Sequence, residues 1–342
     1  MRLKLLLIFL FTPLMGCQEV YNSNAESNVS SKIEYPTPEV GEGTHIKIST
    51  TKGNFNVWTK KIGNNPSMKV LLLHGGPGVT HEIFENFSKH LPDAGIEFYY
   101  YDQLGSYFSD QPDSPDLWKI DRFVDEVEQV RIALGLNESN FYLFGQSWGG
   151  ILGMEYALKY QNNLKGLIIS NMMSSIPAYN KYASEVMETK IDTDILSKIK
   201  SFEDAEDYHN PVYMELLIEH HYVNHILRRP FQDWPKGVVR ALEHLNPKVY
   251  IPMQGPSELG ASGLLEKWDI TESLSKITVP TLVIGAKYDT MDPRHMEWMS
   301  TQIPNARYAY MPNGSHLSQY DDEDKYFNSL ISFISDVNTP MN

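Results

Sequence analysis

Hydrophobic residues occur along most of the chain in short runs that polar and glycine-rich stretches separate. Eight such runs predict strands, because each is short, largely continuous and bounded by turn residues. They span residues 46–49, 55–62, 69–73, 96–102, 141–144, 166–170, 280–285 and 306–312. Helical patterns lie between several of them, at about 117–134, 148–160, 293–302 and 322–334. Strands alternating with helices predict an α/β domain with a mostly parallel sheet, led by an antiparallel hairpin.

The alternation of strands and helices stops between residues 172 and 264. Met, Tyr, His and Glu occur there in helical arrays, without a strand pattern. We therefore expect a helical cap at 172–264, inserted between two parts of the core at 45–171 and 265–342. Insertions at the loop end of such a sheet commonly cover the functional site.

The N-terminus has the pattern of a targeting segment. Residues 1–17, MRLKLLLIFLFTPLMGC, combine a basic start with an apolar run too short to span a membrane, which predicts a secretory signal. Their end resembles the lipobox of bacterial lipoproteins, in which the thiol of Cys17 is acylated. An ordinary signal peptide with an incidental cysteine is the alternative. The Ser-, Asn- and Glu-rich residues 18–44 predict a flexible tether.

Composition narrows the partners without identifying one. The chain has 342 residues, 42% hydrophobic and 21% charged, which is ordinary globular material. Its net charge of -14 argues against binding to nucleic acid and against docking on anionic lipid through basic patches. The single cysteine excludes an intramolecular disulfide. We expect a membrane-anchored lipoprotein on the periplasmic or cell-surface side, held there by its N-terminal lipid.

The segment GQSWGG at 145–150 is the strongest chemical signal. It follows the predicted strand at 141–144 and precedes a predicted helix, as G-x-S-x-G does in a nucleophile elbow. Glycines leave room in this tight corner, and the start of the helix favours developing negative charge. We predict Ser147 as the nucleophile. A glycine-rich turn with a solvated serine is the alternative.

A nucleophilic serine needs a base and an orienting acid, which follow it in the order acid, then histidine. Among 11 histidines, His316 alone lies in a predicted strand-to-helix loop near the C-terminus. Asp289 follows the predicted strand at 280–285 and is the predicted acid. Asp292 precedes a proline and predicts a helix N-cap. His295 is expected on the surface of that helix.

The segment HGGPG at 74–78 ends a predicted core strand with residues that pack little area. Acyl transfer passes through an oxyanion, which requires preorganised donors. The Trp148 N–H, directly after the nucleophile, is one predicted donor, and a loop after an early strand supplies the second. Glycines permit this close approach. We predict the Gly76 N–H, with Gly75 as the near alternative.

Together these motifs resemble the proline iminopeptidases. The resemblance runs from about residue 45 to the C-terminus and rests on HGGPG (74–78), YDQLG (101–105), GQSWGG (145–150), MQGPSELGASG (253–263), GAKYD (285–289) and GSH (314–316). It implies an α/β-hydrolase fold: a mostly parallel central sheet, helices on both faces and an inserted helical cap. It also implies a serine aminopeptidase that releases N-terminal residues, often proline, from short peptides. No cofactor is expected.

Reading a free α-amine requires a carboxylate in a partly dry pocket. The family has such a glutamate in a G-P-[NS]-E block, so the resemblance assigns the role to Glu258, and Tyr250 matches a family tyrosine. The chain departs from the family at Thr290, where a second glutamate often follows the triad aspartate. It departs again at Tyr107 and Phe108. These departures bear on substrate preference more than on hydrolysis.

Other hypotheses remain open from the residues alone. An amino-acid amidase or an esterase would use the same triad, and a non-catalytic lipoprotein would bind a small ligand in its place. His221 and His225 lie four apart, a zinc-compatible spacing, but no HExxH pattern is present. We expect a cap-helix surface there, and no metal. The acidic stretch 321–325 is expected to be the solvated start of the last helix.

Overall fold

The computed structural model describes residues 43–339. Eight strands form one sheet in the order β1-β2-β4-β3-β5-β6-β7-β8. β2 is antiparallel to β1 and to β4, and the other neighbouring pairs are parallel. The strands are β1 (Thr44–Thr50), β2 (Gly53–Ile62), β3 (Lys69–Leu73), β4 (Glu97–Asp102), β5 (Phe141–Gln146), β6 (Gly166–Ser170), β7 (Thr281–Ala286) and β8 (Ala306–Met311). The predicted fold class and its leading hairpin are confirmed.

Helices occupy most of the remaining chain. They are α1 (Phe87–His90), α2 (Ile120–Ala133), α3 (Trp148–Tyr160), α4 (Ile176–Tyr182), α5 (Thr193–Asp204), α6 (Pro211–Leu217), α7 (Val223–His225), α8 (Lys236–Glu243), α9 (Pro247–Met253), α10 (Pro293–Gln302), α11 (Ser318–Asp321) and α12 (Glu323–Asn338). None of these helices is long and apolar enough to cross a membrane. The predicted signal peptide, Cys17 and most of the tether lie outside the described residues.

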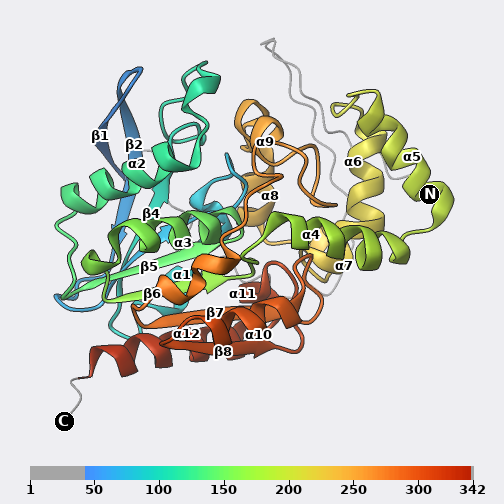
Figure 1. Cartoon of the computed structure of the whole chain (residues 1–342). Helices are drawn as coiled ribbons and strands as arrows, with labels where there is room; N and C mark the ends of the chain where they lie inside the picture. Colours follow the sequence, from blue (N-terminus) through green and yellow to red (C-terminus); the bar gives the residue numbers. More distant parts are fainter. Residues whose placement is uncertain (1–42, 340–342) are drawn as a thin grey trace, which may run out of the picture.

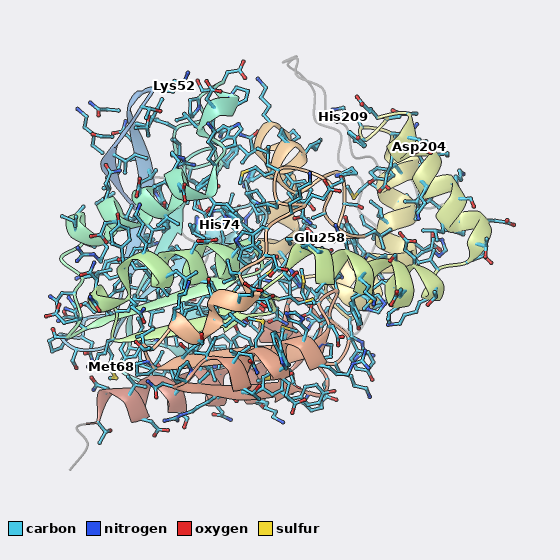
Figure 2. The ribbon with its side chains drawn as sticks, viewed as in Figure 1. Lys52, Met68, His74, Asp204, His209 and Glu258 are labelled. Carbon is cyan, nitrogen blue, oxygen red and sulfur yellow. The ribbon has the colours of Figure 1, made fainter. Side chains whose placement is uncertain are left out.

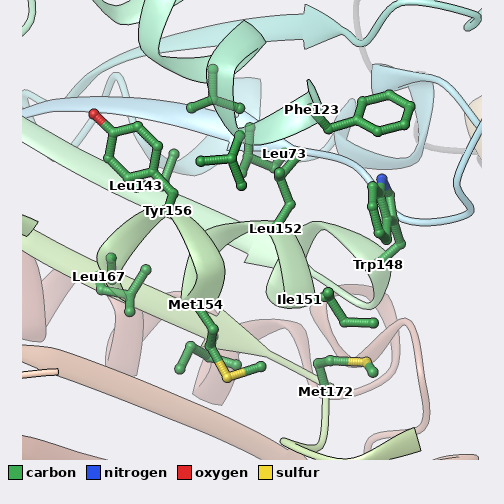
Figure 3. Close-up of a cluster of buried hydrophobic side chains, with 14 of the residues drawn as sticks. Leu73, Phe123, Leu143, Trp148, Ile151, Leu152, Met154, Tyr156, Leu167 and Met172 are labelled. Carbon is green, nitrogen blue, oxygen red and sulfur yellow. The ribbon is translucent and has the colours of Figure 1, made fainter. Parts of the chain in front are cut away.

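Both faces of the sheet are covered, because successive side chains of a strand point to opposite faces. In β3, Leu71 and Leu73 pack in one buried cluster, whereas Val70 and Leu72 pack in another. The first cluster includes residues of α2, α3 and α10, and the second includes residues of α1 and α12. Figure 1 shows these helices along the sheet, and Figure 3 shows part of the first cluster, between α3 and the strands.

The segment between β6 and β7 carries α4 to α9 and, among the described residues, no strand beyond an isolated bridge from Ser175 to Asp269. Several of its helices begin with a side-chain cap, which satisfies an N–H that the helix leaves unpaired. The capping residues are Ser175 for α4, Asp192 for α5, Asn210 for α6 and Asn246 for α9.

This insertion has a small hydrophobic core of its own. Tyr213, Leu217 and Trp234 are buried in it together with Leu317 and Tyr320, which belong to the segment after β8. The insertion therefore packs directly on the loop that carries His316. In Figure 1, α5, α6 and α7 stand beyond one end of the sheet, and α8 and α9 lie above it.

Candidate active site

The turn between β5 and α3 is a strained corner that presents Ser147. Its backbone has φ 55° and ψ -125°, in a region that residues other than glycine rarely adopt. A Cβ on Gly145 would lie 2.0 Å from the Gly149 carbonyl oxygen. A Cβ on Gly149 would lie 2.1 Å from the Leu73 carbonyl oxygen. Both glycines are therefore required by close backbone approach, and the corner has the shape of a nucleophile elbow.

Asp289 and His316 are brought together from the loops after β7 and β8. His316 Nδ1 lies 2.7 Å from Asp289 Oδ1, and both residues are buried. The same oxygen accepts from the Met291 N–H at 3.1 Å, and Oδ2 accepts from Asn171 Nδ2 at 2.7 Å. These donors fix the orientation of the carboxylate, as an orienting acid requires.

The elbow and the histidine loop are held against each other. The Gln146 side-chain amide donates to the His316 carbonyl oxygen at 3.1 Å, directly beside Ser147. The loops after β5, β7 and β8 all leave the same edge of the parallel sheet, which explains why residues so distant in sequence converge.

The electrostatic surroundings suit His316 as a base. Burial lowers the pKa of His316, but the charge and hydrogen bond of Asp289 outweigh it, with a smaller contribution from Glu258. The net pKa lies above its ordinary value. A histidine whose pKa is raised by a buried carboxylate is well suited to take up and return a proton near neutral pH.

The rejected triad candidates take other positions. Asp292 caps α10, where its carboxylate accepts from the Arg294 N–H at 3.0 Å. The expectation that His295 is a surface residue is wrong. It is half-buried, and its Nε2 lies 2.9 Å from Ser174 Oγ, because α10 packs against the first residues of the insertion.

The oxyanion candidates lie around the elbow. A Cβ on Gly75 would lie 3.2 Å from Ser147 Cβ, so this backbone passes directly over the nucleophile. Gly76 has φ 109°, which favours glycine, and a Cβ there would meet the Val79 nitrogen at 2.9 Å. Within residues 43–339, the N–H groups of Gly75, Gly76 and Trp148 donate to no protein acceptor. All three are therefore available to a bound oxyanion.

Glu258 is fixed in the insertion near the triad. Its Oε1 accepts from the Tyr250 hydroxyl at 2.6 Å, and its backbone carbonyl accepts from the Tyr179 hydroxyl at 2.9 Å. Burial raises the pKa of Glu258 above its ordinary value. The charge of His316 and the Tyr250 hydrogen bond oppose this rise but do not cancel it. The charge of His316 acts on Glu258, so the two groups lie within electrostatic range. Figure 2 labels Glu258 at the insertion and His74 deeper in the core.

Comparison with known proteins agrees with this geometry. The family model of the alpha/beta hydrolase fold matches residues 69–323. The chain is 56% identical over 293 residues to a proline iminopeptidase of Flavobacterium johnsoniae, which covers 86% of this chain and 98% of that protein. It is 55% identical over 296 residues to a proline iminopeptidase of Elizabethkingia meningoseptica, again covering 86% and 98%. The chain belongs to the proline iminopeptidase family.

Two solved structures have a backbone similar to that of this chain. The crystal structure of VinJ matches with a TM-score of 0.79 at 26% identity, and covers 86% of this chain and 99% of that one. The crystal structure of a proline iminopeptidase of Mycobacterium smegmatis matches with a TM-score of 0.75 at 25% identity and the same coverage. The chain is an aminopeptidase of the proline iminopeptidase type, on the α/β-hydrolase fold.

The residues that depart from the family pattern lie in two places. Thr290 is fully buried behind the triad, with Oγ1 3.3 Å from His316 Nδ1 and 3.4 Å from Asp289 Oδ1. Tyr107 is half-exposed and stacks on His244, with ring centroids 3.8 Å apart. Phe108 packs beside it, 5.1 Å between ring centroids. Thr290 thus contacts the Asp289–His316 pair, whereas the two aromatic residues contact the insertion.

The expectation of a surface position for His221 and His225 is wrong. Both are buried, because the π-helical turn that carries His221 and the short α7 dock on the triad loops. His225 Nδ1 lies 2.8 Å from the Tyr288 carbonyl oxygen, and the His225 carbonyl accepts from the His316 N–H at 2.9 Å. Across residues 43–339, no group of three or more His, Cys, Asp or Glu is arranged to hold a metal ion.

The acidic stretch after His316 also differs from the prediction at one residue. Asp321 is the last residue of α11 and its side chain is 4% exposed, so it is not solvated. Its carboxylate accepts from the Ser315 hydroxyl and from the Arg228 N–H at 3.1 Å. Asp321 therefore connects the histidine loop to the insertion.

Sequence reasoning missed Asn171, which contacts the predicted acid Asp289. Asn171 follows β6 and has φ 53°, a conformation that asparagine tolerates better than most residues. Its amide donates to Asp289 and, at 3.1 Å, to the Ser315 carbonyl, while its Oδ1 accepts from Ser170 and Ser318. The signal that could have identified it is a polar residue at the carboxyl end of a central strand.

Proposed function

We propose that this chain releases N-terminal residues, proline among them, from short peptides through a Ser147–His316–Asp289 triad. Support comes from the 2.7 Å Asp289–His316 pair next to the strained Ser147 elbow, combined with Glu258 within electrostatic range of that pair. Relatives at 55–56% identity carry the name proline iminopeptidase. The observation that carries the proposal is a carboxylate, Glu258, whose charge interacts with that of His316, since a free α-amine requires such a partner.

In the proposed reaction, Ser147 Oγ attacks the carbonyl carbon of the first residue. His316 Nε2 takes the hydroxyl proton, because its Nδ1 is engaged by Asp289. The Gly76 and Trp148 N–H groups stabilise the oxyanion. The tetrahedral intermediate collapses, the C–N bond breaks, and His316 gives its proton to the leaving amine. His316 then takes a proton from water, whose oxygen attacks the acyl-enzyme; as the ester bond to Ser147 Oγ breaks, His316 returns the proton to Ser147 and the amino acid is released.

Glu258 is the proposed partner of the substrate ammonium. Tyr250 fixes one carboxylate oxygen through its hydroxyl, which leaves the other oxygen for the substrate. A carboxylate at this position selects peptides and amino-acid amides with a free N-terminus, and excludes N-acylated ones.

The test compares Glu258→Gln with the parent enzyme on prolyl arylamide and on its N-acetyl derivative. We expect kcat/KM for the free amine to fall about 100-fold, in line with loss of a charge-assisted contact of about 3 kcal/mol. The low activity on the N-acetyl substrate should stay unchanged. An equal loss on both substrates would show that Glu258 does not read the amine. Ser147→Ala should abolish turnover of both, and retained activity there would exclude the triad mechanism.

We also propose that the mature protein is held outside the cytoplasm by lipid on Cys17. The support is the lipobox-like end of residues 1–17, with the single cysteine at the required position. Cells expressing the parent chain and Cys17→Ser would be fed an alkyne fatty acid and fractionated. Label and membrane association should both disappear in Cys17→Ser. Equal membrane association of the two would refute the anchor.

A further inference from the structure

The first residue of the HGGPG segment, His74, has no part in the mechanism above. It is fully buried at the end of β3. Its Nδ1 lies 2.9 Å from the Gly75 carbonyl oxygen. Its Nε2 accepts from the Gln103 N–H at 3.2 Å and lies 3.2 Å from Ser106 Oγ. Both ring nitrogens are thus engaged, which fixes the orientation of the imidazole.

These contacts determine where the proton of His74 lies. A backbone N–H only donates, so Nε2 must be unprotonated and the ring proton must be on Nδ1. Burial lowers the pKa of His74 despite the opposing charge of Asp102, which keeps the ring neutral. Neutral His74 therefore donates from Nδ1 to the Gly75 carbonyl oxygen.

A donor on a carbonyl also sets the direction of the next N–H, because the two groups share one peptide plane and point in opposite directions. Holding the Gly75 carbonyl fixes the Gly76 N–H. The Gln103 side-chain amide holds the His74 carbonyl in the same way, at 3.2 Å, and so fixes the Gly75 N–H. Either glycine N–H is thus oriented by a side chain that takes no part in the proposed mechanism.

Gln103 also contacts the side chain of Trp148, the residue whose backbone N–H is the second proposed donor. Its Oε1 accepts from the Trp148 indole N–H at 2.7 Å, and Trp148 supplies the backbone N–H directly after the nucleophile. Both residues are buried. Figure 3 shows the Trp148 side chain at the start of α3, beside Phe123. A single amide thus links the loop after β3 to the turn after β5, which provide the two sides of the oxyanion site.

We propose that His74 and Gln103 are positioning residues that set the spacing and direction of the oxyanion donors. This inference rests on the proposed serine-hydrolase function. Oxyanion donors act on the transition state more than on bound substrate, so their misalignment lowers kcat rather than raising KM. Gln103 acts through the Trp148 indole and the His74 carbonyl, so removing either of its partners interrupts the same link.

The experiment is a double-mutant cycle of Gln103→Met and Trp148→Phe, with exposed Gln302→Met as the matched control. Trp148→Phe removes the indole donor but keeps the backbone N–H. We measure kcat and KM on prolyl arylamide, the affinity for a prolyl trifluoromethyl ketone and the affinity for free proline. The ketone forms a tetrahedral adduct with an oxyanion, whereas proline does not. Thermal unfolding confirms that each variant is folded.

We expect each single variant to lose about 10- to 100-fold in kcat and in ketone affinity, with KM and proline affinity within twofold of the parent. The double variant should be little worse than Gln103→Met, since both changes break one link. Gln302→Met should match the parent. Additive losses, unchanged ketone affinity or equal loss of proline affinity would overturn the proposal. Failure of the serine mechanism itself is distinguished by a fully active Ser147→Ala enzyme.

Discussion

Substitution of Asn171 tests how the Asp289–His316 pair is kept in position. Its Nδ2 donates to Asp289 Oδ2 at 2.7 Å and to the Ser315 carbonyl at 3.1 Å, so one side chain joins the acid to the histidine loop. Its backbone has φ 53°. Substitution therefore has two separable costs, the lost hydrogen bonds and the strain of a left-handed backbone, and two variants resolve them.

Asn171→Gly removes the side chain but tolerates the backbone conformation. The side chain makes one hydrogen bond to a charged group, worth about 1.5–3 kcal/mol, and three neutral ones worth about 1 kcal/mol each, so we expect a loss of about 4.5–6 kcal/mol in the free energy of unfolding. Asn171→Ala loses the same bonds and adds about 1 kcal/mol, because alanine is strained at positive φ. Alanine should thus be the less stable variant, although it is the larger residue.

The assay is urea unfolding of both variants and the parent, with kcat on prolyl arylamide measured alongside. With Asp289 Oδ2 unpaired and the Ser315 carbonyl released, His316 is less well aligned, and we expect kcat to fall on the order of 10- to 100-fold in both variants. The reasoning is refuted if Asn171→Gly retains the parent stability and kcat, or if alanine is more stable than glycine at this position.

Three further predictions use the same enzyme. The Glu258 carboxylate raises the pKa of His316, which must be neutral to act as base. Glu258→Gln should therefore move the acidic limb of the pH profile of kcat/KM to lower pH. An acidic limb that stays in place on an N-acetyl substrate would contradict this. Gly145→Ala places a Cβ 2.0 Å from a carbonyl oxygen, so it should cost about 3 kcal/mol or more in urea unfolding. Asp321→Ala leaves the Ser315 hydroxyl and the Arg228 N–H without their acceptor, so it should lose about 1.5–3 kcal/mol. Exposed Asp324→Ala should unfold like the parent; equal stabilities of the two variants would rule out a role for the buried side chain of Asp321.

Much of the fold was predictable because its strands are continuous apolar runs that need no distant partner to be recognised. The run at 69–73 is buried on both faces of the sheet, so it shows neither the alternation of a surface strand nor the length of a helix. Ser147, Asp289 and His316 could be proposed from the sequence for a related reason. Each follows a recognisable strand, and parallel strands bring their following loops to one edge.

The residues that sequence reasoning misplaced depend on contacts between distant segments. His225 and Asp321 stand in polar surroundings typical of a solvated helix, and only the docking of the insertion on the loop after β8 buries them. Asn171 is a single asparagine in an ordinary-looking loop, and its function follows from Asp289, which lies 118 positions further along the chain. Periodicity and local composition depend only on residues that are near in sequence, so they cannot predict contacts between segments that are distant in sequence.

The same contacts decide how the insertion can move. The His316 N–H donates to the His225 carbonyl, the Leu317 N–H donates to the Ile226 carbonyl at 2.9 Å, and the Ser315 hydroxyl donates to that same carbonyl. Lifting residues 225–226 away from the core would break all three bonds and release the backbone around His316. These bonds therefore hold residues 225–226 against the loop that carries His316. We therefore expect motions that admit substrate to occur in other parts of the insertion, where they leave the bonds to the His316 loop intact.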